Sequence, residues 1–239
     1  MSDPGSHLDN TAFGELYRSD TTAAEKVPWD LGAPQPIVVA LAEAGGFTGD
    51  VLDVGCGFGD NSMFLASRGL RVTGVDFALP AVQAARSRAA EKGVDVTFDV
   101  ADATELDGYE ACFDSLLDSA LYHCLPEEER HRYVAALVRA TRPGARLHLL
   151  CFSTGLRGVL PDQYLVSEEN LRETIGRRWT IERLEPAQFT TGCTHAQLGA
   201  SMRMIHGEEF DTSGFASLTT DDDGHVLMPF WQLEAVRAA

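Results

Sequence analysis

Three closely spaced glycines, Gly55, Gly57 and Gly59, follow the apolar run 51–54 and precede a helical pattern. A glycine turn at the carboxyl end of a parallel strand lets a ligand approach the backbone, and the following helix presents unpaired N–H groups to it. Asp53 lies two residues before the first glycine, and Cys56 lies within the turn. Because like charges repel, a carboxylate there disfavours a pyrophosphate and favours a ligand with an ammonium group.

A second acid closes the next apolar run, 71–76. Asp76 follows Gly55 by 21 residues, close to the spacing of about 20 expected for an acid that accepts hydrogen bonds from ribose hydroxyls. Phe77 comes next and could lie against an adenine ring or simply pack in the core.

Acids also follow the third and fourth apolar runs, 94–100 and 113–119. Asp102, beside Ala103, could accept a hydrogen bond from an adenine amino group, and Asp118 lies near the end of the fourth run. Any single acid could be a solvated strand end or a helix cap. Four acids at matching positions indicate one ligand-binding edge, where open α/β sheets bind their ligands.

Helical patterns at 61–67, 79–92 and 126–141 separate these strands, and a fifth strand is expected at 145–152. Asp60 or Asn61 could cap the first helix, while Pro126 and three glutamates suit the start of the third. Alternating strands and helices predict an α/β fold: a Rossmann-like, mostly parallel sheet with helices on both faces.

The last third of the chain is less regular. A helix is expected at 167–175, a strand at 179–184 and a final strand at 226–236, where Pro229 would suit only an edge or a bulge. The long connection 190–224 is interpreted as part of a lid over an acceptor molecule, the alternative being a mobile surface segment.

Composition is consistent with one domain of 239 residues, of which 44% are hydrophobic. No apolar run is long enough to span a bilayer, and the N-terminal residues lack a secretion pattern. The five cysteines show no metal-binding spacing, so no metal site is predicted and a cytoplasmic location with reduced thiols is favoured. A net charge of −17 argues against nucleic acid as a partner.

The segments 52–59, 74–76, 102–103 and 113–123 resemble the glycine, ribose, adenine and fourth motifs of the class I S-adenosylmethionine-dependent methyltransferases. The resemblance implies S-adenosyl-L-methionine as cofactor and a seven-stranded sheet whose last strand is antiparallel. It divides the single domain into N-terminal cap helices (1–45), a cofactor-binding core (46–152) and C-terminal strands with the lid (153–239). The predicted cofactor-binding residues are Trp29, Asp53, Gly55, Cys56, Gly57, Gly59, Asp76, Phe77, Asp102, Ala103 and Asp118.

A narrower resemblance concerns residues 28–36, which are similar to the entry segment of enzymes near the thiopurine and thiol methyltransferases. In that group the tryptophan, here Trp29, lies beside the cofactor; its alternative role is to pack the first helix on the sheet. The expected acceptor is a small molecule, a thiol, a phenol or an N-heterocycle.

Methyl transfer requires in-line positioning, exclusion of water and a deprotonated nucleophile. His123, just beyond Asp118, is the candidate general base, although it could instead cap or pack the next helix; Tyr17 and Tyr122 are candidate walls of the acceptor pocket. Two other functions stay open: an NAD-dependent oxidoreductase and a protein that binds the cofactor without catalysis. The sequence Asp118-Ser119-Ala120-Leu121 lacks the Pro-Pro-aromatic turn expected of nucleic-acid amino methyltransferases.

Overall fold

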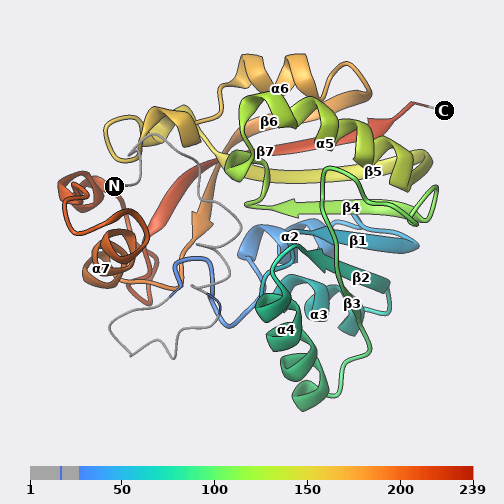
Figure 1. Cartoon of the computed structure of the whole chain (residues 1–239), viewed down its shortest axis with the longest axis horizontal. Coiled ribbons are helices and arrows are strands. Elements are labelled where there is room, and N and C mark those ends of the chain that lie inside the picture. The colour runs from blue at the N-terminus through green and yellow to red at the C-terminus, as the bar shows by residue number, and fades with distance from the viewer. Residues whose placement is uncertain (1–16, 18–26, 239) are drawn as a thin grey trace.

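The computed structural model describes residue 17 and residues 27–238. Its centre is a seven-stranded sheet in the order β3-β2-β1-β4-β5-β7-β6, in which β7 runs antiparallel to both neighbours (Figure 1). The predicted Rossmann-like sheet with an antiparallel last strand is therefore confirmed. The strands are β1 (Asp50–Val54), β2 (Arg71–Asp76), β3 (Thr97–Val100), β4 (Phe113–Ser119), β5 (Thr141–Phe152), β6 (Trp179–Thr190) and β7 (Leu227–Arg237).

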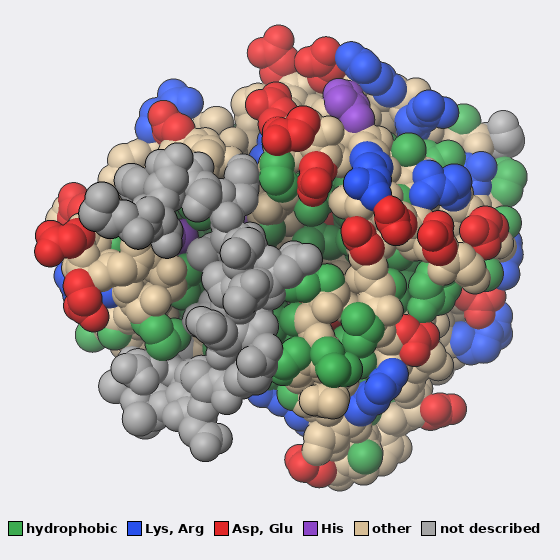
Figure 2. All heavy atoms as spheres, viewed as in Figure 1, with side chains coloured by type: hydrophobic (Ala, Val, Ile, Leu, Met, Phe, Trp, Pro, Cys, Tyr) green, Lys and Arg blue, Asp and Glu red, His purple; other side chains and the backbone are tan. Residues whose placement is uncertain are grey.

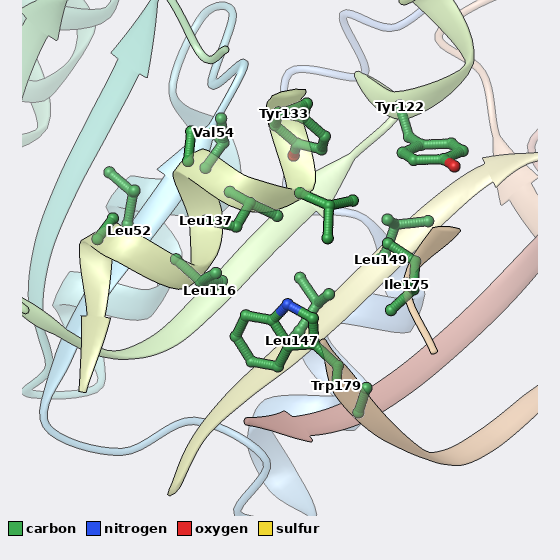
Figure 3. Packing of buried hydrophobic residues seen from close by; sticks show 14 of the residues in the cluster. Leu52, Val54, Leu116, Tyr122, Tyr133, Leu137, Leu147, Leu149, Ile175 and Trp179 are labelled. Carbon is green, nitrogen blue, oxygen red and sulfur yellow. The ribbon is translucent and has the colours of Figure 1, made fainter. Parts of the chain in front are cut away.

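Helices cover both faces of the sheet. They are α2 (Pro36–Glu43), α3 (Asp60–Ser67), α4 (Leu79–Lys92), α5 (Glu127–Ala140), α6 (Glu168–Thr174) and α7 (His195–His206), with short 3-10 turns η1 (Tyr122–Cys124), η2 (Thr154–Leu156), η3 (Asp162–Tyr164) and η4 (Ser213–Ser217). In β4, Leu116 belongs to the buried cluster under α5 and α6, whereas Leu117 belongs to the cluster under α2 and α3. Successive strand residues thus serve opposite faces, and Figure 3 shows Leu116, Leu137 and Leu147 packed on the α5 side.

Several element boundaries differ from the sequence prediction. The strand β3 begins at Thr97 and β6 continues to Thr190, so the former is shorter and the latter longer than expected. The helix α3 begins at Asp60 behind Gly59, whose φ of 80° makes a glycine N-cap in place of the predicted side-chain cap. Asn61 instead accepts a hydrogen bond of 2.9 Å from the backbone N–H of Gln35.

Pro229 lies in an interior strand, not at the edge of the sheet, yet its position explains why it is tolerated. The ladder between β5 and β7 ends at the pair Phe152 and Phe230. Pro229 lies one residue beyond, where its carbonyl accepts from the Ser153 N–H at 3.2 Å. The side of Pro229 that lacks an N–H therefore faces the end of β5, which makes this position a local edge.

The segment 190–224 contains α7 and η4 and is fastened to the residues before α2. The Gln35 side chain donates to the Thr190 carbonyl at 2.8 Å and accepts from the Thr190 N–H at 3.2 Å. The Gly192 N–H donates to the Pro28 carbonyl at 2.8 Å. Of the cap helices predicted within 1–45, α2 is described; residues 1–16 and 18–26 lie outside the described part of the chain.

The visible face in Figure 2 shows Lys and Arg side chains interspersed with Asp and Glu, without a continuous basic patch. Within residues 27–238, no helix has both the length and the apolar composition needed to cross a bilayer.

The aromatic ring of Phe98 on β3 fixes how closely α3 and β2 approach one another. A Cβ atom built on Gly59 would lie 2.5 Å from Cζ of Phe98, and one on Gly74 would lie 2.7 Å from its Cδ1 and Cε1 atoms. Both glycines therefore make room for one ring. Gly59 in addition has a positive φ, whereas Gly74 does not.

Gly74→Ala should consequently destabilise the fold by about 1–3 kcal/mol, because the added methyl group overpacks the core. Phe98→Leu should relieve the contact, so the double variant should recover more than about 1 kcal/mol of the sum of the two single losses. Urea unfolding of the four proteins measures this coupling, and strictly additive losses would contradict it.

Candidate functional site

Two adjoining pockets open at the carboxyl edge of the parallel strands. The first surrounds the glycine turn and is lined by Asp53, Gly55, Cys56, Gly57, Gly59 and Asn61 among others. The second is apolar, and its walls include Phe152, Leu160, Leu198, Met202, Met228 and Phe230. Trp29, Gly55, Ser119 and Phe189 line both, so these four residues mark the junction of the pockets.

The glycine turn is shaped by positive φ angles of 71° at Gly55 and 52° at Gly57. The N–H groups of Gly55 and Cys56 donate to the Val75 carbonyl at 2.8 and 3.0 Å, which ties the turn to β2. A Cβ atom on Gly55 would lie 2.9 Å from Cβ of Leu121, so side chains are excluded here. The predicted strand, turn and helix are all present and leave the backbone open to a ligand.

Asp53 lies on the wall of the glycine-turn pocket and is 1% exposed. Its carboxylate accepts a hydrogen bond of 2.6 Å from the Ser62 hydroxyl. Burial, and to a smaller extent the neighbouring Asp118 and Asp76, raise the pKa of Asp53 to about 7. A cationic group bound beside it would favour the ionised form and draw the pKa down again.

Asp76 at the end of β2 holds the turn from the other side. Its two carboxylate oxygens accept from the Gly57 N–H at 3.0 Å and from the Ala78 N–H at 2.9 Å. Burial raises its pKa. Asp76 and Phe77 both line the apolar pocket, so the structure brings them to the same edge as Asp53.

Two other strand-end acids have different surroundings. Asp102 is exposed, and its carboxylate accepts from the backbone N–H and hydroxyl of Thr104 at 2.8 and 2.7 Å. Ala103 is partly buried against the α5-side cluster, and neither residue is on the walls of the two pockets. Their contact with adenine stays a prediction.

Asp118 is fully buried beneath the site rather than on its wall. It accepts from the Tyr133 hydroxyl at 2.7 Å and from the Leu121 and Tyr122 N–H groups at 2.9 and 3.3 Å. Burial raises the pKa of Asp118 to about 6. These contacts make Asp118 the anchor of η1 and α5.

The two candidate tyrosines are placed differently. The Tyr17 hydroxyl accepts from the Trp29 indole N–H at 3.1 Å, and both rings line the apolar pocket beside the glycine turn. Tyr122 is not on either wall: its buried hydroxyl contacts Asn170 at 3.0 Å and Thr174 at 2.6 Å on α6. The structure therefore gives Tyr122 a core position.

His123 lines the apolar pocket and is 4% exposed. Its Nδ1 atom accepts a hydrogen bond of 3.2 Å from the Phe152 N–H, and its ring lies 3.8 Å from that of Phe152. Because Nδ1 is an acceptor, the proton of the neutral ring resides on Nε2. In this tautomer neither nitrogen has a free lone pair, so the geometry favours a packing role over that of a general base.

Sequence reasoning missed three features of the apolar pocket. Ser119 lies at the junction, and Phe189 stacks on Phe230 with centroids 4.4 Å apart. His206 at the end of α7 is a second histidine on the wall, stacked on Phe210, and burial lowers its pKa. Aromatic and serine residues are too common for their positions alone to have indicated the site.

A separate group of exposed and half-buried side chains, Asp221, Asp223 and His225, brings potential metal ligands within 4.8 Å of one another. The Asp221 carboxylate accepts from the Asp223 and His225 N–H groups at 3.0 and 2.8 Å. These bonds within one turn account for the proximity of the three residues.

The glycine-turn pocket matches the chemistry of S-adenosyl-L-methionine. The cofactor carries two positive centres, its ammonium and its sulfonium, and the site is bordered by Asp53 and Asp76, two carboxyl groups whose pKa values are raised by burial. A dinucleotide would add negative pyrophosphate to the same place.

Comparison with known proteins agrees. A family model for a methyltransferase domain matches residues 51–144. The chain is 37% identical over 231 residues to the 2-heptyl-1-hydroxyquinolin-4(1H)-one methyltransferase of Mycobacteroides abscessus, spanning 94% of this chain and 96% of that protein.

Two solved structures share the fold. A protein studied for the conversion of a disulfide bond into a thioacetal group during echinomycin biosynthesis is 30% identical, with a TM-score of 0.76 over 96% of this chain and 92% of that one. The 1,6-didemethyltoxoflavin-N1-methyltransferase of Burkholderia thailandensis, crystallised with S-adenosylhomocysteine, is 20% identical, with a TM-score of 0.59 over 88% and 80% of the two chains.

The chain belongs to the class I S-adenosylmethionine-dependent methyltransferases, and it is an enzyme that uses S-adenosyl-L-methionine as cofactor. The oxidoreductase and the purely binding alternatives are thereby set aside. The narrower resemblance to thiopurine and thiol methyltransferases stays a prediction.

The raised pKa of Asp53 predicts pH-dependent cofactor binding. In the free protein Asp53 holds a proton below about pH 7, and an ammonium group must displace it, so affinity should fall as the pH drops from about 8 to about 6. Calorimetry with S-adenosylhomocysteine should detect release of up to about one proton at pH 6. Asp53→Asn should bind more weakly and with a flatter profile; an equally steep profile in this variant would assign the titration to another group.

Proposed function

We propose that this enzyme methylates a small, flat heteroaromatic acceptor at an oxygen bonded to a ring nitrogen, as in a 2-alkyl-1-hydroxyquinolin-4-one. The observation that carries the proposal is the similarity to the hydroxyquinolinone methyltransferase, which extends over nearly the whole of both chains. The match spans 94% of this chain, and the segments 152–165 and 189–230 supply much of the apolar pocket.

The aromatic wall of that pocket suits a flat ring. Phe230 is stacked on Phe189 at an interplanar angle of 15°, and Phe152 meets Phe230 edge to face at 5.0 Å. The same offset and edge-to-face contacts are available to a planar aromatic ligand that packs against these rings from the pocket.

The rest of the wall suits an alkyl chain. Leu160, Leu198, Met202 and Met228 line the pocket with side chains that offer no strong hydrogen-bonding group. Burying an alkyl chain among them is favourable by about 0.8 kcal/mol for each methylene group. The residues of α7 in this set support the interpretation of 190–224 as part of a lid.

The acceptor's own acidity supports the choice of an N-hydroxyl group. The anion of a 1-hydroxyquinolin-4-one is delocalised through the ring to the carbonyl oxygen, so little basic assistance is needed. This agrees with His123, whose Nδ1 lone pair is engaged by the Phe152 N–H. The acceptor would enter the site as its anion.

The cofactor, when bound, supplies a methyl group activated by a positively charged sulfur. Asp53 would pair with its ammonium group, and Asp76 would accept from its ribose hydroxyls while still holding the Gly57 N–H. Trp29 at the junction would exclude water from the reacting centre, and Phe77 would lie beside the adenine ring. Every one of these contacts orients rather than transforms the reactants.

A matched pair of acceptors tests the proposal. With labelled S-adenosylmethionine, 2-heptyl-1-hydroxyquinolin-4(1H)-one should be methylated, whereas 2-heptylquinolin-4(1H)-one, which lacks only the N-hydroxyl group, should not. Mass spectrometry and NMR of the product locate the methyl group. Turnover of both compounds at equal rates would show that the oxygen on nitrogen is not the acceptor.

A thiol is the second candidate acceptor, because a 30% identical structure is associated with sulfur chemistry on a disulfide. Small aromatic thiols and reduced dithiols belong in the same panel. Turnover confined to thiols would replace the oxygen acceptor with sulfur.

Substitution of His123 and of His206, the two histidines on the pocket wall, tests whether the acceptor loses its proton without a general base. If the acceptor ionises by itself, the acid limb of the pH profile of kcat should keep its position in His123→Ala and in His206→Ala, even where repacking lowers the rate. Rates from about pH 5 to about pH 9 measure this. Loss of the acid limb in either variant would identify that histidine as the general base.

A further inference from the structure

Ser119, the last residue of β4, has a buried hydroxyl group for which the described structure contains no hydrogen-bond partner. A buried hydroxyl without a partner costs free energy on the order of 1–3 kcal/mol, and native proteins retain few such groups. An unpaired hydroxyl at a ligand site is therefore evidence that a ligand supplies the missing bond.

The position of Ser119 restricts what that ligand is. It is one of four residues on the walls of both pockets, together with Trp29, Gly55 and Phe189. Of these, Trp29 already donates its indole N–H to Tyr17, and Gly55 and Phe189 have no polar side-chain group. Among these four residues, Ser119 thus has the only side-chain hydroxyl group. It lies at the junction of the two pockets, where the cofactor and the acceptor would meet.

The backbone directly after Ser119 is strained and is held in place by hydrogen bonds. Ala120 has a φ of 82°, in the left-handed region that costs a residue with a side chain about 1–2 kcal/mol. The Ala120 N–H donates to the Leu150 carbonyl at 2.9 Å, and the Leu121 N–H to Asp118 at 2.9 Å, so neighbouring strands and the buried acid hold the turn. Strain of this kind is typical of ligand sites.

We propose that Ser119 is a positioning residue that donates its O–H to the acceptor's nucleophilic oxygen. The proposal rests on the oxygen acceptor proposed above. The oxygen, already deprotonated, gives a lone pair to the methyl carbon as the carbon–sulfur bond breaks and its electron pair stays on sulfur. Ser119 keeps its proton throughout; its hydrogen bond aims the remaining lone pair along the line of attack and stabilises the bound anion.

The test compares wild type with Ser119→Ala, Ser119→Thr and the control Ser115→Ala. Ser115 lies in the same strand, but its hydroxyl bonds to the Thr48 backbone at 2.9 and 3.0 Å, away from both pockets. Steady-state kinetics use 2-heptyl-1-hydroxyquinolin-4(1H)-one, calorimetry measures S-adenosylhomocysteine affinity, and thermal unfolding measures stability.

Ser119→Ala should lower kcat/KM about 10- to 100-fold, the range for a hydrogen bond to a charged group. Its cofactor affinity should stay within about twofold and its Tm should not fall, because no protein bond is lost. The acid limb of kcat should move to higher pH, since the bound acceptor anion loses a donor. Ser119→Thr, which retains a hydroxyl, should recover part of the rate and the wild-type acid limb, and Ser115→Ala should match wild type in kinetics.

If the wild-type enzyme methylates the oxygen acceptor and Ser119→Ala does so at the same rate, the proposed role of Ser119 is wrong, while the proposed function still holds. The proposed role of Ser119 is also wrong if Ser119→Ala loses as much cofactor affinity as kcat/KM. In that case the Ser119 hydroxyl would bind the cofactor and not the acceptor. Absence of wild-type turnover on every oxygen acceptor would overturn the proposed function, and with it the oxygen as partner of Ser119.

Discussion

Burial of several carboxyl groups at one edge of the sheet is the constraint on which this site depends. Asp53, Asp76 and Asp118 are each at most 6% exposed, and burial raises the pKa of all three. Such groups are stable only with hydrogen-bond donors or a positive partner. The protein supplies donors to each of them, from Ser62, Gly57 and Tyr133. The positive charge that remains to be added selects a cationic ligand over an anionic one.

The carboxyl groups serve this purpose because the surrounding backbone is fixed. Asp76 bonds to the glycine turn, the turn bonds to β2 through Val75, and the ring of Phe98 lies against both Gly59 and Gly74. A shift of α3 or β3 would thus change the spacing of the acids. Asp118 has the same role on the other face, where it anchors η1 and hence the turn that presents Ser119.

The sheet, the glycine turn and the positions of Asp53 and Asp76 at the strand ends could be predicted, because glycine spacing and strand-end acids are visible in the sequence. The direction of Asp118 could not. The sequence of β4 is apolar on both faces at Leu116 and Leu117, so it lacks the alternation that would tell inside from outside. The structure puts Asp118 on the Leu116 side, towards Tyr133, and Ser119 on the opposite side. An unpaired hydroxyl has no sequence signal at all, since pairing depends on three-dimensional neighbours.

The bonds between Gln35 and Thr190 and between Gly192 and Pro28 have a mechanical consequence. They join the residues that carry Trp29, on the cofactor side, to the segment that leads into α7, on the acceptor side. A Cβ atom on Gly192 would lie 2.1 Å from the Asp30 carbonyl oxygen, so the two chain segments touch without intervening side chains. A displacement of either segment is therefore transmitted directly to the other, so the wall beside the cofactor pocket and the wall beside the acceptor pocket are mechanically linked.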